Sequence, residues 1–214
     1  MARGEIQDGR VTRAERQRRE RRESVLAAAR GVFADKGYHS ASITDILDAA
    51  DIARGTFYLY FQSKRAIFDE LLDNFFDHLR EKVRPIAVDG SAPPPLVQMR
   101  GIVRHVLEEL VHNGDLTGIL LHEAMGIDQE FDEKVRDFYG RILGLLQGAL
   151  TMGKDMGLVR SDLDPVTNSY CILGSVKELV SHLVTEAEAG RAPDLERITG
   201  EVVNFNLSGV FRDQ

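Results

Sequence analysis

The stretch Ser42 to Phe61 reads SITDILDAADIARGTFYLYF and decides the fold that we predict for this chain. Ser42 has the character of an N-cap, and the apolar residues behind it are spaced three, four and seven positions apart, as on one face of a short helix. Asp51 and Ile52 then predict a tight turn. The segment 54–60 predicts another short helix, whose Phe57 faces inward together with Phe61.

A longer helix is expected ahead of this stretch, from about residue 13 to 35. Thr12 and Glu15 have capping-box spacing, apolar residues recur with helical periodicity after Val25, and Gly37 ends the helix. Three helices around one apolar cluster are the layout of a helix-turn-helix DNA-binding domain.

The rest of the chain also predicts helices. Ser63 is expected to cap a fourth helix that Pro85 stops, and the glycine- and proline-rich segment up to Pro95 predicts a loop. Further helices are expected near 96–113, 115–126, 128–153, 164–189 and 193–211. No alternating stretch of strand length occurs, so the predicted fold class is all-α. The expected parts are a basic arm at 1–22, a helix-turn-helix domain at 23–65 and a larger helical domain at 66–214.

The composition is that of an ordinary globular protein, with 43% hydrophobic and 29% charged residues. We find no apolar run near the roughly 18–20 residues that cross a bilayer, and no signal peptide. The expected location is the cytoplasm, without membrane contact. The single cysteine, Cys171, fits a reducing compartment and is expected to be a small core residue.

The net charge of −7 is unevenly distributed. Residues 1–65 hold 13 Lys and Arg against 9 Asp and Glu, whereas residues 66–214 hold 14 against 25. Eight arginines precede residue 23. A basic end on an acidic body is expected of a protein that approaches DNA through that end, although a solvated helix face gives the same pattern.

Several motifs in the N-terminal third resemble the TetR family of bacterial repressors. They are Gly37-Tyr38, Ser42-Ile43-Thr44-Asp45-Ile46, Ala49-Ala50, Arg54-Gly55-Thr56-Phe57-Tyr58-Leu59-Tyr60-Phe61 and Ser63-Lys64. The resemblance covers roughly residues 23–72. It implies a divergent helical body that dimerises and usually holds an effector pocket.

Two positions depart from the family pattern. Asp51 replaces the usual glycine of the turn, but aspartate tolerates the left-handed conformation better than most residues. Ala53 replaces the usual Ser or Thr cap of the recognition helix, which is expected to cost about 1 kcal/mol of local stability.

The resemblance places the DNA-binding residues at Ser42, Thr44, Arg54, Gly55, Thr56, Tyr58, Leu59, Tyr60 and Lys64. Arg54 has the fork geometry to read guanine, with a phosphate contact as the alternative. Leu59 offers apolar contact to a thymine methyl, or else packs partly into the core. Tyr58 either reaches a phosphate or packs.

Hydroxyl groups and cations are expected to meet phosphates. Thr56 and Tyr60 share one helix face, and Ser42 and Thr44 lie at a helix N-terminus, where anions are favoured. Lys64 is either a phosphate contact or a solvated lysine. The arginines before residue 23 are expected to enter an adjacent minor groove and to add affinity rather than specificity.

The expected partners are a pseudo-palindromic double-stranded DNA operator and a second copy of the chain. The last two helices carry more apolar residues than one core face needs, so they are expected to form a homodimer interface, with completion of the monomer core as the alternative. A small apolar or amphipathic effector is expected to release the DNA. Candidate pocket residues, each alternatively plain core, are Met99, His105, Met125, Phe131, Phe138, Tyr139 and Cys171.

Two other functions stay open. An all-helical metalloenzyme would use pairs such as Glu178 with His182, or His105 with Glu108, but paired Glu-x-x-His motifs, a zinc motif and a nucleophile elbow are missing from the sequence. We therefore expect no enzyme activity and no cofactor. The remaining alternative is a DNA-bound adaptor that is controlled by a protein partner and has no small-molecule effector.

Overall fold

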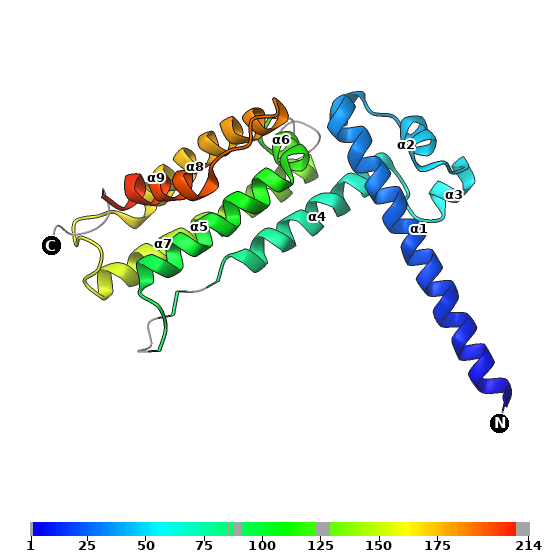
Figure 1. The fold of residues 1–214 in the computed structure, drawn as a ribbon, viewed down its shortest axis with the longest axis horizontal. Coiled ribbons are helices and arrows are strands. Elements are labelled where there is room, and N and C mark those ends of the chain that lie inside the picture. Colours follow the sequence, from blue (N-terminus) through cyan, green and yellow to red (C-terminus); the bar gives the residue numbers. More distant parts are fainter. Residues whose placement is uncertain (1, 85, 88–90, 123–128, 209–214) are drawn as a thin grey trace. The chain divides into compact units, whose positions relative to one another are not determined.

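The structure is a computed structural model of the chain, and it describes residues 2–84, 86–87, 91–122 and 129–208. Side chains are described from residue 13 onward, apart from 122, 207 and 208. The described residues form nine helices and confirm the all-α prediction (Figure 1). These are α1 (Ala2–Ser40), α2 (Ile43–Ala50), α3 (Arg54–Tyr58), α4 (Lys64–Lys82), α5 (Pro95–His112), α6 (Gly114–His122), α7 (Gln129–Asp155), α8 (Pro165–Glu188) and α9 (Leu195–Ser208).

The first helix begins earlier than predicted. It starts at Ala2 rather than near residue 13, because Thr12 and Glu15 at capping-box spacing also fit a helix interior and do not by themselves mark its first residue. The predicted end is confirmed, since Gly37 breaks the helix with φ 74° and ψ 158°. A side chain is strongly disfavoured in that conformation, which glycine adopts without a steric penalty.

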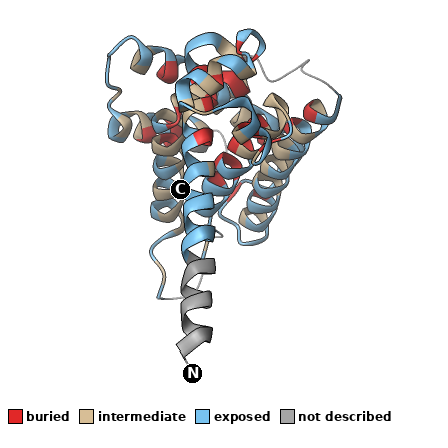
Figure 2. Ribbon diagram, turned by 90° about the vertical axis from the view of Figure 1, so that its right-hand side faces the viewer, coloured by how far each residue is buried: buried red, intermediate tan, exposed pale blue. Residues whose placement is uncertain are grey.

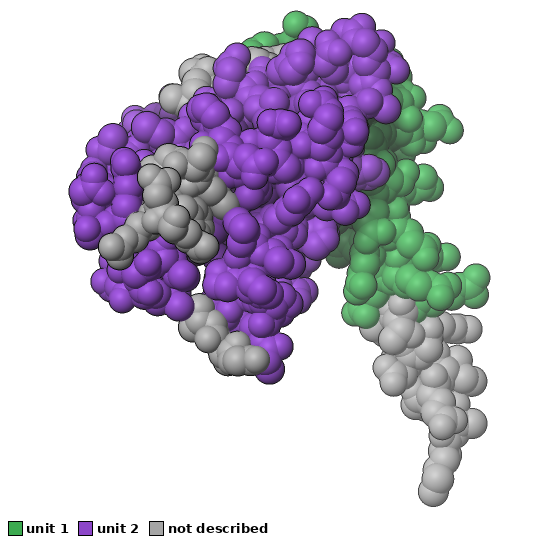
Figure 3. All heavy atoms as spheres, turned by 60° about the vertical axis from the view of Figure 1, so that its left-hand side comes forward, with its two compact units in different colours: residues 1–74 green, residues 75–214 purple. Residues whose placement is uncertain are grey.

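The chain divides into two compact units, Met1–Asn74 and Phe75–Gln214 (Figure 3). Aromatic rings form the centre of the first unit. The Phe33 ring meets Phe68 edge to face with centroids 5.5 Å apart, and the Tyr38 ring lies 4.4 Å from Phe68. This cluster joins α1 to α4, and it is extended by other buried apolar residues, namely Val25, Ala29, Ile46, Phe57, Phe61, Ile67 and Leu72. Buried positions of this kind recur along the inner faces of the helices (Figure 2).

The caps of α2 and α3 match the sequence predictions. Ser42 caps α2, and its backbone N–H donates to Asp45 Oδ2 at 2.8 Å while its hydroxyl accepts from the Asp45 N–H at 3.2 Å. Asp51 ends α2 in the left-handed region with φ 50° and ψ 55°. Ala53 gives α3 no side-chain cap.

The second unit packs α5 and α8 together with α6 and α9. Its main cluster is formed by Leu107, Val180, Leu183 and Val184, and a smaller one by Leu150, Val159 and Leu163. The carboxylate of Glu196 at the start of α9 pairs with Arg100 and Arg104 of α5 at 2.9 and 2.8 Å. Within the described residues, no helix is long and apolar enough to span a membrane.

The core position predicted for Cys171 is wrong, because this residue is exposed on α8. Its neighbours Ser169 and Ile172 carry the packing instead, since Ser169 is buried and Ile172 packs on the Leu150 cluster. A single small apolar residue in a helix does not by itself reveal which face it occupies.

Asp45 makes the stability of α2 sensitive to acid. Hydrogen bonds from Lys36, at 2.7 Å, and from Ser42 lower the pKa of the Asp45 carboxyl from 3.8 to about 2. A lowered folded-state pKa contributes stability above the unfolded pKa, and this contribution is lost as the pH falls through the folded pKa.

We therefore expect the thermal midpoint of the wild type to fall between about pH 3.8 and pH 2 by more than that of Asp45→Asn. The measurement is thermal unfolding as a function of pH, with the exposed Asp48→Asn as control. Parallel pH profiles for wild type and Asp45→Asn would contradict this assignment.

Candidate functional site

The helix α3 turns one face outward and one face inward. Phe57 is fully buried, and its ring lies 6.2 Å from that of Phe61. Arg54 and Gly55 are exposed on the first turn. Tyr58 is 49% exposed and Leu59 is 69% exposed, so the core-packing alternative for Leu59 is wrong. The inner aromatic pair thus fixes α3 from behind and leaves its outer face uncovered.

Ser42 and Thr44 are both exposed at the N-terminus of α2. The Ser42 hydroxyl donates to Asp45 Oδ2 at 2.8 Å and accepts from the Asp45 backbone, so it is engaged within the protein. The backbone N–H of Ser42 is also bonded to Asp45, so the role of Ser42 as a cap is confirmed, while its contact with a phosphate stays a prediction.

A groove lies between the basic part of α1 and the end of α3. It has a volume of about 350 Å³ and is lined by Glu15, Arg18, Arg19, Arg22, Leu59 and Tyr60. Arg18 and Arg19 are exposed, whereas Tyr60 is half-buried. The arginines of α1 therefore lie beside the recognition helix.

Arg22 is the exception among these arginines. Its guanidinium makes a bidentate ion pair with the Glu70 carboxylate of α4 and lies 4.7 Å from the centroid of the Phe61 ring. A bidentate pair of this kind engages both terminal nitrogens of the guanidinium and holds it against α4. Arg22 is thus a structural residue that fastens α1 to α4, and we exclude it from the basic arm.

Lys64 has an internal role that the sequence did not predict. Its ammonium donates to the backbone carbonyls of Tyr38 and Ala41 at 2.7 Å each, and lies 4.5 Å from the Tyr38 ring centroid. Burial lowers the pKa of Lys64. Helix ends leave carbonyls without intrahelical partners, and Lys64 supplies donors to those that follow the break at Gly37.

The second unit holds the predicted pocket residues, of which two stand out. The Phe138 ring stacks on Phe76 of α4 with centroids 3.8 Å apart and an interplanar angle of 11°. The Tyr139 ring lies 5.6 Å from the Phe138 ring, and the Tyr139 hydroxyl is buried. No pattern within either helix predicts that Phe76 meets Phe138.

The other pocket candidates differ in their exposure. Phe131 is fully buried, Met99 is half-buried and Cys171 is exposed. Met125 lies outside the described residues. The exposure of Cys171 on α8 leaves it no role as a buried lining residue.

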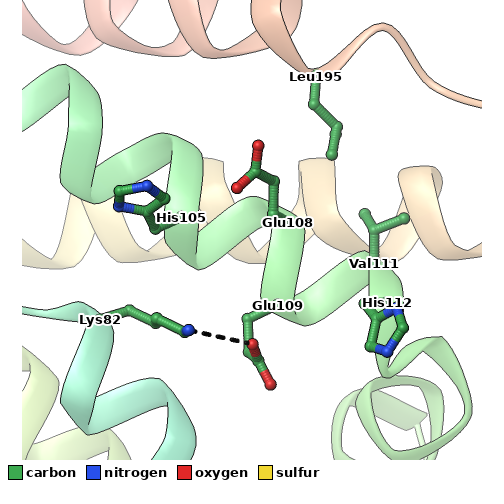
Figure 4. Close-up of a pocket in the computed structure, with 7 residues that line it drawn as sticks. All are labelled: Lys82, His105, Glu108, Glu109, Val111, His112 and Leu195. Carbon is green, nitrogen blue, oxygen red and sulfur yellow. Dashed lines mark ion pairs between the residues drawn. The ribbon is translucent and has the colours of Figure 1, made fainter.

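His105 lines an open groove of about 430 Å³ between α4, α5 and the start of α9 (Figure 4). The other lining residues are Lys82, Glu108, Glu109, Val111, His112 and Leu195. The Glu109 carboxylate lies 3.8 Å from the Lys82 ammonium and 3.9 Å from His78 Nδ1. Two histidines and two glutamates line this groove. Even so, among the described residues no three His, Cys, Asp or Glu side chains are placed so that they could hold a metal ion together.

Comparison with known proteins agrees with the geometry of the first unit. The model of the family described as "Bacterial regulatory proteins, tetR family" matches residues 25–71. The HTH-type transcriptional repressor KstR2 of Mycobacterium tuberculosis is 32% identical over 145 residues, which are 67% of this chain and 72% of KstR2. The chain belongs to the TetR family. It is therefore a DNA-binding transcriptional regulator and not the metalloenzyme considered above.

Solved structures extend this likeness to the body. The fatty acid degradation regulator FadR from Bacillus halodurans matches with a TM-score of 0.70 and 26% identity, over 88% of this chain and 95% of FadR. The transcriptional regulator FadR from Bacillus subtilis, solved in complex with stearoyl-CoA, shares the fold with a TM-score of 0.68 and 24% identity, over 87% and 98% of the two chains.

The internal role of Lys64 leads to a testable contrast with Arg54. We expect Lys64→Met to lower the free energy of unfolding by about 1 to 2 kcal/mol. The substitution removes the charged donor of the backbone carbonyls of Tyr38, His39 and Ala41. DNA affinity, measured well below the thermal midpoint, should change little.

The control is Arg54→Ala, which removes an exposed cation from the same unit and should leave the unfolding free energy within about 0.5 kcal/mol. Denaturant unfolding and gel-shift titration are run on both variants. If Lys64→Met lost DNA affinity without losing stability, Lys64 would be a phosphate contact and not a structural residue.

Proposed function

We propose that this TetR family protein is a repressor that binds a pseudo-palindromic operator as a homodimer and is released by a small-molecule effector. The outward face of α3 carries the DNA part of the proposal. A recognition helix enters the major groove with its first residues toward the base edges, while the preceding helix crosses the backbone. Arg54 and Leu59 are the exposed side chains in position to read bases.

The proposed contacts divide by chemistry. Arg54 pairs with guanine through its fork, and Leu59 touches a thymine methyl. Gly55 presents bare backbone on the first turn of α3, where an added Cβ would meet nothing of the protein within 4 Å. The proposed phosphate contacts are Thr44, Thr56, Tyr58 and Tyr60 through their hydroxyls, whereas Ser42 caps the helix that presents Thr44.

Arg18 and Arg19 supply the remaining affinity in this proposal. Their place beside Leu59 and Tyr60 supports contacts with the DNA backbone next to the recognition helix. Contacts to phosphate and sugar fix the position of a protein on DNA but carry little sequence information.

Exposed apolar side chains support the homodimer. Phe205 of α9 is 74% exposed and Val166 of α8 is 52% exposed, so the last two helices carry apolar surface that a second copy could cover. Burying them against the same helices of a second copy gives the twofold symmetry that a palindromic operator requires. The expected site of action is the cytoplasm.

The proposed effector is an acyl-CoA, which binds in the helical part, residues 66–214. Support comes from the FadR relatives, one of which regulates fatty acid degradation and one of which holds stearoyl-CoA. The stack of Phe138 on Phe76 links α7 to α4. An effector that binds better to the DNA-incompetent state releases the operator, and α4 is the proposed carrier of that change.

Selection of bound sequences from random DNA tests the proposal. We expect a palindromic consensus of two half-sites, because each copy of the chain reads one. Stearoyl-CoA is then titrated into the operator complex and should dissociate it. No enrichment at low salt would contradict DNA reading, whereas enrichment without release by any acyl-CoA would contradict the effector alone.

Two sets of variants should separate base reading from backbone contact. Arg54→Ala should cost about 1 to 3 kcal/mol on the consensus operator and relax the preference at one base position. Arg18→Gln with Arg19→Gln should weaken binding to all sequences alike. It should also reduce the slope of log affinity against log salt by about 2, since two phosphate contacts are lost.

These variants are compared by gel-shift titration at several salt concentrations. A salt slope that the double Gln variant leaves unchanged would place Arg18 and Arg19 off the DNA.

A further inference from the structure

The hydroxyl of Tyr139 on α7 is unusual in its surroundings. Within the described part of the chain it is the only buried side-chain nitrogen or oxygen that has no hydrogen-bond partner. Burial raises the pKa of this phenol, so it stays protonated and is available as a donor. A buried donor without a partner destabilises a protein, and such groups in native proteins usually meet a ligand or a water molecule.

The neighbours of Tyr139 are apolar or cationic rather than acceptors. Its ring lies beside Phe138, whose own ring is stacked on Phe76. The Lys177 ammonium lies 5.3 Å from the centroid of the Tyr139 ring, and a lysine offers donors but no acceptor. A ligand that fits here needs an apolar part for the phenylalanines and one acceptor oxygen for the phenol.

We propose that Tyr139 Oη donates a hydrogen bond to the carbonyl oxygen of an effector whose adjoining part is apolar. This rests on the proposed function, in which a small molecule binds the helical body. The thioester carbonyl of an acyl-CoA and the ketone of a steroid share this chemistry. Pockets of this kind are lined mainly by apolar side chains, and a few polar groups set specificity.

The test removes the carbonyl from the ligand and the hydroxyl from the protein. Stearoyl-CoA and its thioether analogue stearyl-CoA, which lacks the carbonyl oxygen, are titrated calorimetrically into the full chain and into Tyr139→Phe. We expect the wild type to prefer stearoyl-CoA by about 3- to 10-fold, and Tyr139→Phe to bind both equally. A 3-ketosteroid and its deoxy analogue form the second arm, and a preference confined to that arm assigns the carbonyl to a steroid.

The unliganded protein provides an independent readout. Tyr139→Phe removes the unpaired hydroxyl without changing the ring, so we expect its thermal midpoint to equal or exceed that of the wild type. A merely structural hydroxyl would lower the midpoint when removed. The matched control for ligand binding is Tyr170→Phe, at a tyrosine of α8 that is 60% exposed, and it should leave the ligand preference unchanged.

Several results would overturn the proposal. Equal carbonyl preference in wild type and Tyr139→Phe removes Tyr139 from the ligand and leaves the proposed function intact. A weakened dimer with unchanged ligand binding assigns the hydroxyl to a second copy of the chain. If neither carbonyl ligand binds the wild type, both this proposal and the acyl-CoA effector fail, while operator selection still judges DNA binding separately.

Discussion

The packing of aromatic rings between α1 and α4 is the constraint on which the first unit depends. The helices α2 and α3 have eight and five residues, too few to be stable in isolation. They persist because Ile46 and Phe57 are fully buried in the same unit whose centre is formed by the rings of Phe33, Tyr38 and Phe68. The orientation of the base-reading face is therefore determined by side chains that never approach DNA.

Two cations that resemble DNA ligands in the sequence strengthen this same platform. Lys64 binds carbonyls at the end of α1, and Arg22 joins α1 to Glu70 of α4. Both partners are distant in sequence, 26 and 48 residues for Tyr38 and Glu70. A charge count treats every cation in this part alike, whereas the fold separates those engaged internally from Arg18, Arg19 and Arg54 on the surface.

The range over which an interaction acts explains what the sequence could predict. The cap at Ser42, the left-handed Asp51 and the break at Gly37 are set by residues one to four positions away, and the structure matches all three predictions. The predicted start of α1 was wrong, because Thr12 and Glu15 at capping-box spacing also fit the interior of a helix. The surface position of Cys171 and the Phe76–Phe138 stack depend on how separate helices meet, and no local pattern in one helix reveals this.

The recognition helix shows how the family fold tolerates its two departures here. Ala53 gives α3 no cap, and Asp51 takes a conformation that costs most residues energy. Both departures lie just before the start of α3. The side chains of Phe57, within α3, and Phe61, just after it, are buried and hold the helix in place. Burying one phenylalanine stabilises by about 1.5 to 3 kcal/mol, more than a cap contributes. Burial of Phe57 and Phe61 thus stabilises α3 in place of a side-chain cap at Ala53. The first turn of α3 therefore has no side chain of its own chain capping it.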